Sequence, residues 1–333
     1  MKRLLLACLL LFASSTQSLA AVIGVEDVRV LAPHWTTNTT NPMTEANAAQ
    51  QWAFVHELFY RTSYQQFDHA TTVYPAYAVD PPTTTNKFGV TSPTCMGYAE
   101  KAIAEAIALY DIPAGPEIVV AQYECGHQGR FGTYRRPDGG TNPFVYGGKG
   151  NELAYYYQTQ KGIFGGYAWV CSPGCVATWR RDIYDNAANG DHHSYNAAHR
   201  LQMGWITAAA GDVQTVYATA GQHVVHDLDA ARDGQLKYLR LVGRFGVATV
   251  EVRTDRVVTG VPVVAVSYQA LLTDTSLSAT CAQFYLPVGA TLKPQNEMFG
   301  VRLDAFIDSI ATVTVIENVT VSTVPAQCPV GSK

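Results

Sequence analysis

One segment, residues 151–161, constrains this chain of 333 residues more than any other. Side chains four residues apart lie on one face of a helix, and two histidines at that spacing, in H-E-x-x-H, can hold one zinc ion. In the longer pattern H-E-x-x-H-x-x-G-x-x-H, the glycine lets the chain turn so that a third histidine reaches the same metal. The segment has this layout, but Asn151, Tyr155 and Lys161 stand at the histidine positions. Of the pattern's chemical groups, only the glutamate, Glu152, is present.

These replacements predict a helix that holds no metal. An asparagine amide is a weak zinc ligand, a tyrosine phenol has a reference pKa near ~10, and a lysine ammonium repels a cation. Gln158 also replaces the glycine at which the chain would turn. No cofactor is therefore expected, and Glu152 is the remnant of a general base that has no metal-bound water to deprotonate. We expect its carboxylate to hydrogen-bond Lys161 or a neighbouring tyrosine instead.

A second stretch, residues 196–205, reads Asn-Ala-Ala-His-Arg-Leu-Gln-Met-Gly-Trp. Taken with residues 151–161, it resembles the gametolysin family, the secreted metzincin-type zinc peptidases first known for lysing algal cell walls. In that family the zinc helix is followed by a Met-turn, and then by Asn-Ala-x-His running into Leu/Met-Gly-Trp. Residues 182–186 stand at the Met-turn position but contain neither its methionine nor its glycine. The resemblance therefore implies the family's fold more than its active site.

The order of the preceding segments is also similar to that of the family. Cys95 enters an alanine-rich helix predicted for residues 96–110, like the cysteine that opens the corresponding helix in gametolysin-like proteins. A β-branched strand over residues 117–122 runs into Cys125 and a glycine-rich loop, similar to the loop that precedes the family's zinc helix. Residues 123–127 are themselves a near-miss of H-E-x-x-H, and their position after a strand favours a structural role.

The N-terminus predicts secretion. Lys2 and Arg3 precede an apolar run over residues 4–13, and residues 18–20 supply the small side chains of a signal-peptidase site. We therefore expect residues 1–20 to be a signal peptide and the mature protein to be secreted and extracellular. The apolar run is too short to span a bilayer, and no later stretch reaches ~20 apolar residues, so no membrane span is expected in the mature chain.

Removal of the signal peptide leaves six cysteines, Cys95, Cys125, Cys171, Cys175, Cys281 and Cys328. An even number in an oxidising compartment predicts disulfides, although six cysteines allow about 15 pairings and the sequence does not choose among them. Cys171 and Cys175 could close locally; a metal knuckle is the alternative, but it lacks a second Cys or His pair at zinc-finger spacing. Asn38 and Asn318 begin glycosylation sequons, which are typical of a secreted surface.

Length and composition fit one or two globular domains, since 47% of residues are hydrophobic and 15% are charged. We expect an α+β fold, with a gametolysin-like peptidase domain over residues 21–207 and a β-rich domain over residues 208–333. A strand over residues 22–31 and a helix capped by Thr44 begin the first domain. Short β-branched segments separated by Gly, Asp and Pro argue for a β-sandwich-like second domain. The predicted short strands are residues 74–79 and 88–90 in the first domain and 213–217, 223–228, 236–242, 248–253, 263–268, 281–286, 299–307 and 311–316 in the second.

Four histidines could form a replacement metal site, because imidazole binds zinc, copper and nickel. They are His127, His192, His193 and His199. No carboxylate or further histidine stands four residues from the last three on an evident helix. Positions in surface loops are therefore expected for them.

The sequence predicts a catalytically inactive homologue of these peptidases, which binds an extracellular protein or cell-wall glycoprotein without cutting it. An active secreted zinc metalloendopeptidase, with a ligand set recruited from the four histidines and zinc as its cofactor, is the first alternative. A structural extracellular-matrix protein is the second. A nucleic-acid partner is excluded, because the formal net charge is −4 and the basic residues form no cluster.

Overall fold

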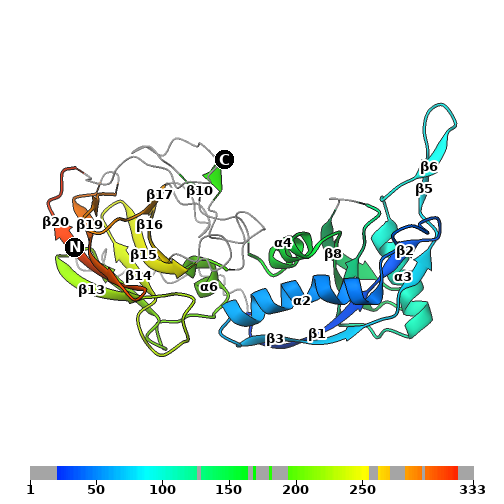
Figure 1. The fold of residues 1–333 in the computed structure, drawn as a ribbon, viewed down its shortest axis with the longest axis horizontal. Helices are drawn as coiled ribbons and strands as arrows, with labels where there is room; N and C mark the ends of the chain where they lie inside the picture. Colours follow the sequence, from blue (N-terminus) through cyan, green and yellow to red (C-terminus); the bar gives the residue numbers. More distant parts are fainter. Residues whose placement is uncertain are drawn as a thin grey trace, which may run out of the picture.

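The computed structural model describes residues 21–125, 129–163, 168–169, 180–181, 194–254, 262–270, 282–294 and 297–321. Sheets make up most of its regular structure and helices are few, so the chain is a mixed α and β protein (Figure 1). Within these ranges no helix combines the length and the apolar character needed to cross a membrane.

The first sheet has five strands in the order β3-β1-β7-β9-β8, of which β8 runs antiparallel to its neighbour. The predicted inner strand is β7, and it lies between β1 and β9 in parallel register. Val119 and Ala121 face one hydrophobic core, whereas Ile118 and Val120 face another. Both faces of β7 are buried, which is why its apolar run is continuous. The bounds are β1 (Gly24–Leu31), β3 (Phe67–Val73), β7 (Glu117–Ala121), β8 (Arg130–Arg135) and β9 (Thr141–Gly147).

Three helices cover this sheet. α2 (Glu45–Thr62) and α4 (Gly150–Gln160) contribute to the core on one face, and α3 (Tyr98–Tyr110) contributes to the core on the other. Thr44 caps α2 as predicted, because its hydroxyl accepts a hydrogen bond from the backbone N–H of Asn47 at 3.1 Å. The sequence therefore predicted all three helices, with ends displaced by at most a few residues.

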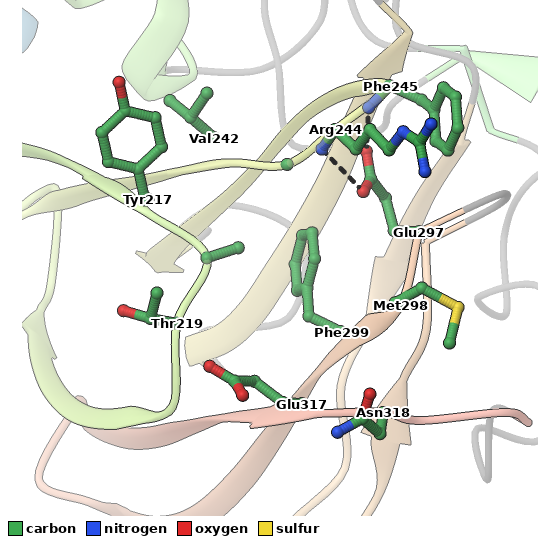
Figure 2. Close-up of a pocket in the computed structure, with 12 residues that line it drawn as sticks. Tyr217, Thr219, Val242, Arg244, Phe245, Glu297, Met298, Phe299, Glu317 and Asn318 are labelled. Atoms are coloured by element: carbon green, nitrogen blue, oxygen red, sulfur yellow. Dashed lines mark hydrogen bonds between the residues drawn. The ribbon is translucent and has the colours of Figure 1, made fainter.

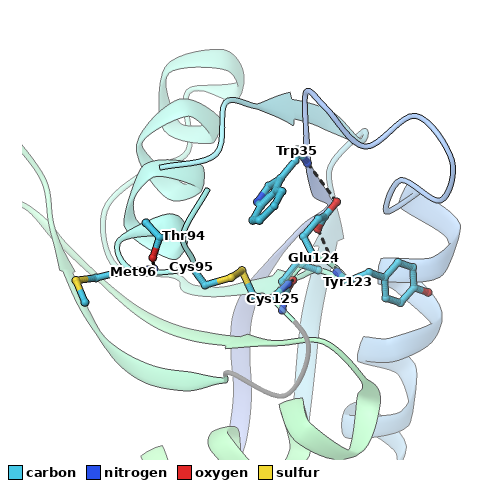
Figure 3. Close-up of a disulfide and its surroundings, with 8 residues drawn as sticks. Trp35, Thr94, Cys95, Met96, Tyr123, Glu124 and Cys125 are labelled. Carbon is cyan, nitrogen blue, oxygen red and sulfur yellow. Dashed lines mark hydrogen bonds between the residues drawn. A yellow bond between two sulfur atoms is a disulfide. The ribbon is translucent and has the colours of Figure 1, made fainter. Parts of the chain in front are cut away.

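A disulfide between Cys95 and Cys125 ties the start of α3 to the loop after β7 (Figure 3). Next to Cys125, a carboxylate oxygen of Glu124 accepts the backbone N–H of Trp35 at 3.2 Å and the side-chain amide of Asn38 at 3.0 Å. The pairing of Cys95 with Cys125 is one of those that the sequence left open. The other four cysteines of the mature chain lie outside the described residues.

Two pairs of short strands lie beside the first sheet. β2 (Pro33–Trp35) pairs with β4 (Tyr77–Val79), and β5 (Thr83–Thr85) forms with β6 (Thr91–Pro93) a hairpin that projects outward in Figure 1. The prediction of a strand at residues 88–90 is wrong, because these residues form the hairpin turn. The Asn86 side chain fixes that turn by accepting the backbone N–H groups of Phe88 and Val90.

Beyond residue 212 the chain forms two further sheets, which are larger than the strand pairs and are called here the two larger sheets. Their strand orders are β12-β14-β15-β16-β17 and β13-β20-β19-β18, and side chains from both sheets share one hydrophobic core. The predicted strands at 213–217 and 299–307 coincide with β12 and β19, and the other predicted strands overlap observed ones. The bounds are β12 (Val213–Tyr217), β13 (Gly221–His226), β14 (Tyr238–Val242), β15 (Gly246–Thr254), β16 (Pro262–Ala270), β17 (Ala282–Tyr285), β18 (Thr291–Leu292), β19 (Phe299–Ile307) and β20 (Ile310–Glu317), with a separate pair β10 (Ala168–Trp169) and β11 (Arg180–Arg181).

A short helix, α6 (Ala197–Gln202), lies between the first sheet and these two sheets in the sequence. Asn196 caps it, because its side-chain oxygen accepts the backbone N–H of His199 at 2.8 Å. After the helix, Trp205 is buried in the core of the first sheet and its indole N–H donates to the carbonyl of Val22 at 2.6 Å. The stretch that runs from Asn196 to Trp205 thus has a structural role. Asn196 caps the start of α6, and Trp205 fixes the chain after α6 to the core of the first sheet.

Candidate functional site

The start of α4 accounts for two of the predicted site residues. A carboxylate oxygen of Glu152 accepts the backbone N–H of Gly148 at 2.8 Å, and the Asn151 side-chain oxygen accepts the N–H of Glu152 at 3.0 Å. A glutamate in the first turn that accepts the N–H of the residue before the N-cap holds the incoming chain against the helix start, and its charge suits the helix N-terminus. Glu152 therefore fixes the start of α4.

The end of α4 differs from the turn that the zinc pattern requires. The helix continues through Gln158, and the chain turns at Gly162, which has φ +83°. The N–H of Ile163 donates to the carbonyl of Gln158 at 2.9 Å, and the N–H of Gly162 donates to Thr159 at 3.0 Å. These two bonds make a Schellman motif, which needs a residue in the left-handed conformation at the position of Gly162. The turn thus comes four residues after the position of the pattern's glycine.

Lys161, the residue that ends α4, points toward the first sheet. Its ammonium lies 2.5 Å from a carboxylate oxygen of Glu26 on β1 and 3.6 Å from one of Glu117 on β7. It also lies over the ring of Tyr157, 4.7 Å from the centroid. The expectation that Glu152 bonds Lys161 is wrong, because nine residue steps along the helix place them about 13 Å apart along the axis.

A directed chain of hydrogen bonds runs through the core next to this ion pair. The Tyr157 hydroxyl donates to Glu26, so it must accept from His69, whose Nε2 lies 2.8 Å away. His69 therefore carries its proton on Nε2, and its Nδ1 accepts from Nδ1 of His56 at 3.2 Å. The chain joins α2, β3, α4 and β1, and it ends at the carboxylate that Lys161 neutralises. His56 is partly buried, and its ring stacks on that of Tyr60.

Burial sets the protonation of two groups in this network. Desolvation, reinforced by the neighbouring His56 and Lys161, lowers the pKa of His69 to about 3, so the imidazole is neutral. Desolvation raises the pKa of Glu117 to about 7, and Lys161 opposes this rise while Glu26 adds to it. Glu117 is therefore partly protonated near neutral pH.

The three residues at the histidine positions of the zinc pattern have different surroundings. Lys161 faces the carboxylates of the sheet, Asn151 accepts the N–H of Glu152, and Tyr155 is 46% exposed with its ring edge-on to Tyr156. Across the described part of the chain, no group of three or more His, Cys, Asp or Glu side chains is arranged to hold a metal ion.

Of the four histidines considered for a replacement site, the structure describes one. His199 lies in α6, is 2% exposed and packs edge-on to the ring of Tyr195. The expectation of a surface-loop position is therefore wrong for His199. His127, His192 and His193, together with residues 182–186 at the Met-turn position, lie outside the described residues.

Sequence reasoning missed Glu26, His69 and Glu117. Glu26 and His69 are polar residues within strands, Glu117 begins one, and the parallel pairing of β1 with β3 and β7 brings the three together. A buried position for Glu117 was implied by the apolar run in which it stands. That run gave no indication of Lys161 as its partner.

The strand β8 lies next to α4 at the edge of the first sheet. One edge of β8 pairs with β9, and its other edge has no partner strand in the described ranges. At Gly129, just before β8, an added Cβ would meet the ring of Tyr156 at 2.0 Å, so the start of the strand packs closely against α4. Phe131 on β8 is 41% exposed.

Comparisons with known proteins add no assignment: no family model matches the chain, and no curated protein matches it.

Proposed function

We propose that this chain is a secreted, catalytically inactive member of the gametolysin-like proteins, and that it binds an extended segment of an extracellular protein or cell-wall glycoprotein. The proposal includes a metzincin-like fold for residues 21–207 and a β-sandwich-like fold for residues 208–333. It also includes a signal peptide at residues 1–20.

The observation that carries the proposal is the ion pair of Lys161 with Glu26 and Glu117. A zinc-binding helix needs a neutral imidazole at this position, with a lone pair aimed at the metal. Here the position holds a cation, which is directed at two carboxylates of the sheet instead. Because Glu152 accepts the Gly148 N–H, its carboxylate is also used in holding the helix start. These contacts hold both ends of α4 without a metal, which supports the proposal.

The order of elements supports the family and the fold. A cysteine at the start of α3, a strand that leads into Cys125, an edge strand and then α4 follow one another as the resemblance implies. For the second domain, the support is the single core shared by a five-stranded and a four-stranded sheet, because two packed sheets bury their inner faces in this way.

We assign ligand binding to the outer edge of β8. An extended peptide can add to an unpaired strand edge through main-chain hydrogen bonds, while its alternate side chains contact the flanking surface. Phe131 on β8 is an exposed aromatic ring, and the neighbouring helix α4 carries another at Tyr155. Aromatic side chains supply large contact areas and are enriched in binding hot spots.

The test is calorimetric titration of the purified protein with peptides from a hydroxyproline-rich cell-wall glycoprotein, followed by analysis of the peptides for cleavage. Phe131→Glu should weaken binding about 10-fold, the loss expected for one interface aromatic. Phe88→Glu is the matched control, because Phe88 is 79% exposed on the β5–β6 turn, and it should change nothing. Glu152→Gln should leave the dissociation constant within about twofold, because the amide oxygen can still accept the Gly148 N–H.

Two results would contradict the proposal, and each would favour a different alternative. Cleavage of the peptides that disappears in Glu152→Gln would favour the active metalloendopeptidase. Peptides that stay intact and do not bind would favour a structural matrix protein.

A further inference from the structure

A pocket of about 600 Å³ lies in the part of the chain formed by the two larger sheets (Figure 2). It is lined by the turn between β12 and β13, the turn between β14 and β15, the start of β19 and the C-terminal end of β20. Its volume is in the range of small-molecule sites, about 300–1,000 Å³. The site on α4 does not involve any of these residues.

The pocket offers exposed rings and a thioether. Tyr217 is 78% exposed, Met298 is 61% exposed and Phe245 is 38% exposed, while the ring of Phe299 is buried beneath them. Arg244 and Glu317 add charged groups to the same lining. A sugar ring has an apolar C–H face that packs on an aromatic ring, and hydroxyls that hydrogen-bond to charged groups at its edge. This combination therefore suits a carbohydrate.

The walls of the pocket are held in place before any ligand binds. The carboxylate of Glu297, 2% exposed, accepts the backbone N–H groups of Arg244 at 2.9 Å and Phe245 at 2.8 Å. On the other side, Glu317 accepts the backbone N–H of Ala220 at 3.0 Å, which fixes the β12–β13 turn. A preorganised site loses less conformational entropy on binding.

Asn318, the first residue of the sequon Asn-Val-Thr, lines this same pocket. It is exposed, follows β20 in the left-handed conformation with φ +58°, and stands beside Met298 in Figure 2. Its side-chain amide makes no hydrogen bond to any residue that the structure describes. A substituent on the amide nitrogen would therefore break no hydrogen bond to that part of the protein.

The other sequon asparagine is in the opposite situation. The Asn38 side-chain nitrogen donates to the carbonyl of Asn41 and to the carboxylate of Glu124, both at 3.0 Å, so both of its hydrogens are used. Its side-chain oxygen accepts the N–H of Asn41 at 3.1 Å. A sugar on Asn38 would replace one of these hydrogens and leave a polar partner unsatisfied.

We propose that Asn318 carries an N-linked glycan whose first sugars lie in this pocket against Tyr217 and Met298, and that Asn38 stays unmodified. In the transfer step, the Asn318 amide nitrogen attacks the anomeric carbon of a lipid pyrophosphate-linked oligosaccharide. A C–N bond forms, the C–O bond to pyrophosphate breaks, the lipid pyrophosphate leaves and one amide proton is released. The inference rests on the secretory route of the proposed function.

The test is glycopeptide mass spectrometry of the full chain secreted by a eukaryotic host. Glycan is expected on nearly every copy at Asn318 and on almost none at Asn38. Equal occupancy, glycan on Asn38 alone, or glycan on neither residue would overturn the assignment. Stoichiometric zinc or peptidase activity would instead sink the proposed function and leave the glycan assignment standing.

A second measurement tests whether the glycan occupies the pocket. A glycan-releasing amidase is added to the folded protein, and the rate of release from Asn318 is followed by mass. Tyr217→Ala should speed release roughly 10-fold, because it removes a stacking surface and frees the sugar. Tyr155→Ala, a tyrosine on α4 that is also exposed, is the matched control and should not change the rate. The same rate in wild type and Tyr217→Ala would overturn the pocket placement.

Discussion

The side chain of Lys161 decides whether the end of α4 pairs with carboxylates of the sheet or can bind a metal. This side chain is 16% exposed, and the Glu117 side chain beside it is fully buried. A buried carboxylate without a counter-charge is costly, so the lysine is needed where it stands. The same charge that stabilises Glu26 and Glu117 repels a divalent metal from this end of α4.

Lys161→Met should therefore lower the free energy of unfolding by about 2–4 kcal/mol, since it leaves two neighbouring carboxylates without their cation. Urea unfolding at neutral pH measures this. The matched control is Lys101→Met, which removes a more exposed pair with Glu105 and should cost less than about 0.5 kcal/mol. Equal effects of the two variants would show that the Lys161 pair contributes no more to the free energy of unfolding than the exposed Lys101 pair.

His69 and Glu117 predict opposite dependences of stability on pH. The pKa of His69 is lowered from 6.5 to about 3, so below pH 6.5 the unfolded chain gains a proton that the folded chain refuses, and stability falls. The pKa of Glu117 is raised from 4.5 to about 7, so between pH 7 and 4.5 the folded chain binds the extra proton, and stability rises on acidification.

The two contributions can be separated by substitution. His69→Gln keeps a donor for Tyr157 and an acceptor for His56, and it should remove the loss of stability below pH 6.5. Glu117→Gln should remove the gain on acidification. Unfolding by urea in steps from pH 7 to 4.5 checks both. Unchanged pH slopes in both variants would contradict the burial argument.

The helix α4 illustrates what could be predicted from the sequence. Its helical spacing and the aromatic residues that pack inward predicted the element correctly. The substitution at Gln158 indicated that the chain would not turn there, but the turn at Gly162 depends on a Schellman motif that the zinc pattern does not contain. The partners of Tyr157 lie 131 and 88 residues away in sequence, at Glu26 and His69, and local periodicity carries no information about such contacts. The hydrogen-bond network around Tyr157 therefore could not be predicted from the sequence.

The late turn of α4 has a consequence for any attempt to rebuild a zinc site. Asn151→His with Tyr155→His places two imidazoles four residues apart, and adding Lys161→His should not increase zinc affinity, because residue 161 faces Glu26. Adding Gln158→Gly as well should increase it, since a turn at residue 158 would redirect residue 161. Calorimetric zinc titration compares the double, triple and quadruple variants. Tighter binding by the triple variant than by the double variant would contradict this geometry.

Arg200 links parts of the chain that lie far apart in sequence. Its guanidinium is fully buried, pairs with Asp229 and donates to the carbonyl of Leu228 at 2.7 Å, while the Tyr64 hydroxyl donates to the same carbonyl. Burial alone would raise the pKa of Asp229, but Arg200 lowers it below its ordinary value. The junction between the first sheet and the two larger sheets thus includes a buried charged pair and its hydrogen bonds. Arg232, which donates to Gln66 at 2.9 Å, and the apolar contacts of Tyr64 add to it.

Arg200→Met should cost about 3–5 kcal/mol, because it leaves the Asp229 carboxylate buried without its partner. We also expect the calorimetric unfolding transition to separate into two, because the substitution weakens the contacts that couple the parts. Arg302→Met is the control, since Arg302 pairs with Asp304 at a surface where its side chain is 44% exposed. A single transition in Arg200→Met would show that other contacts couple the two parts.

The zinc content of the unmodified chain tests the central claim most directly. The protein is secreted from cells grown with added zinc, purified without chelator, and analysed by mass spectrometry for metal per mole of chain. The lysine at the end of α4 predicts far less than one zinc per chain, in wild type and in Glu152→Gln alike. About one zinc per chain, together with peptidase activity that Glu152→Gln abolishes, would contradict the account and identify the chain as an active metallopeptidase.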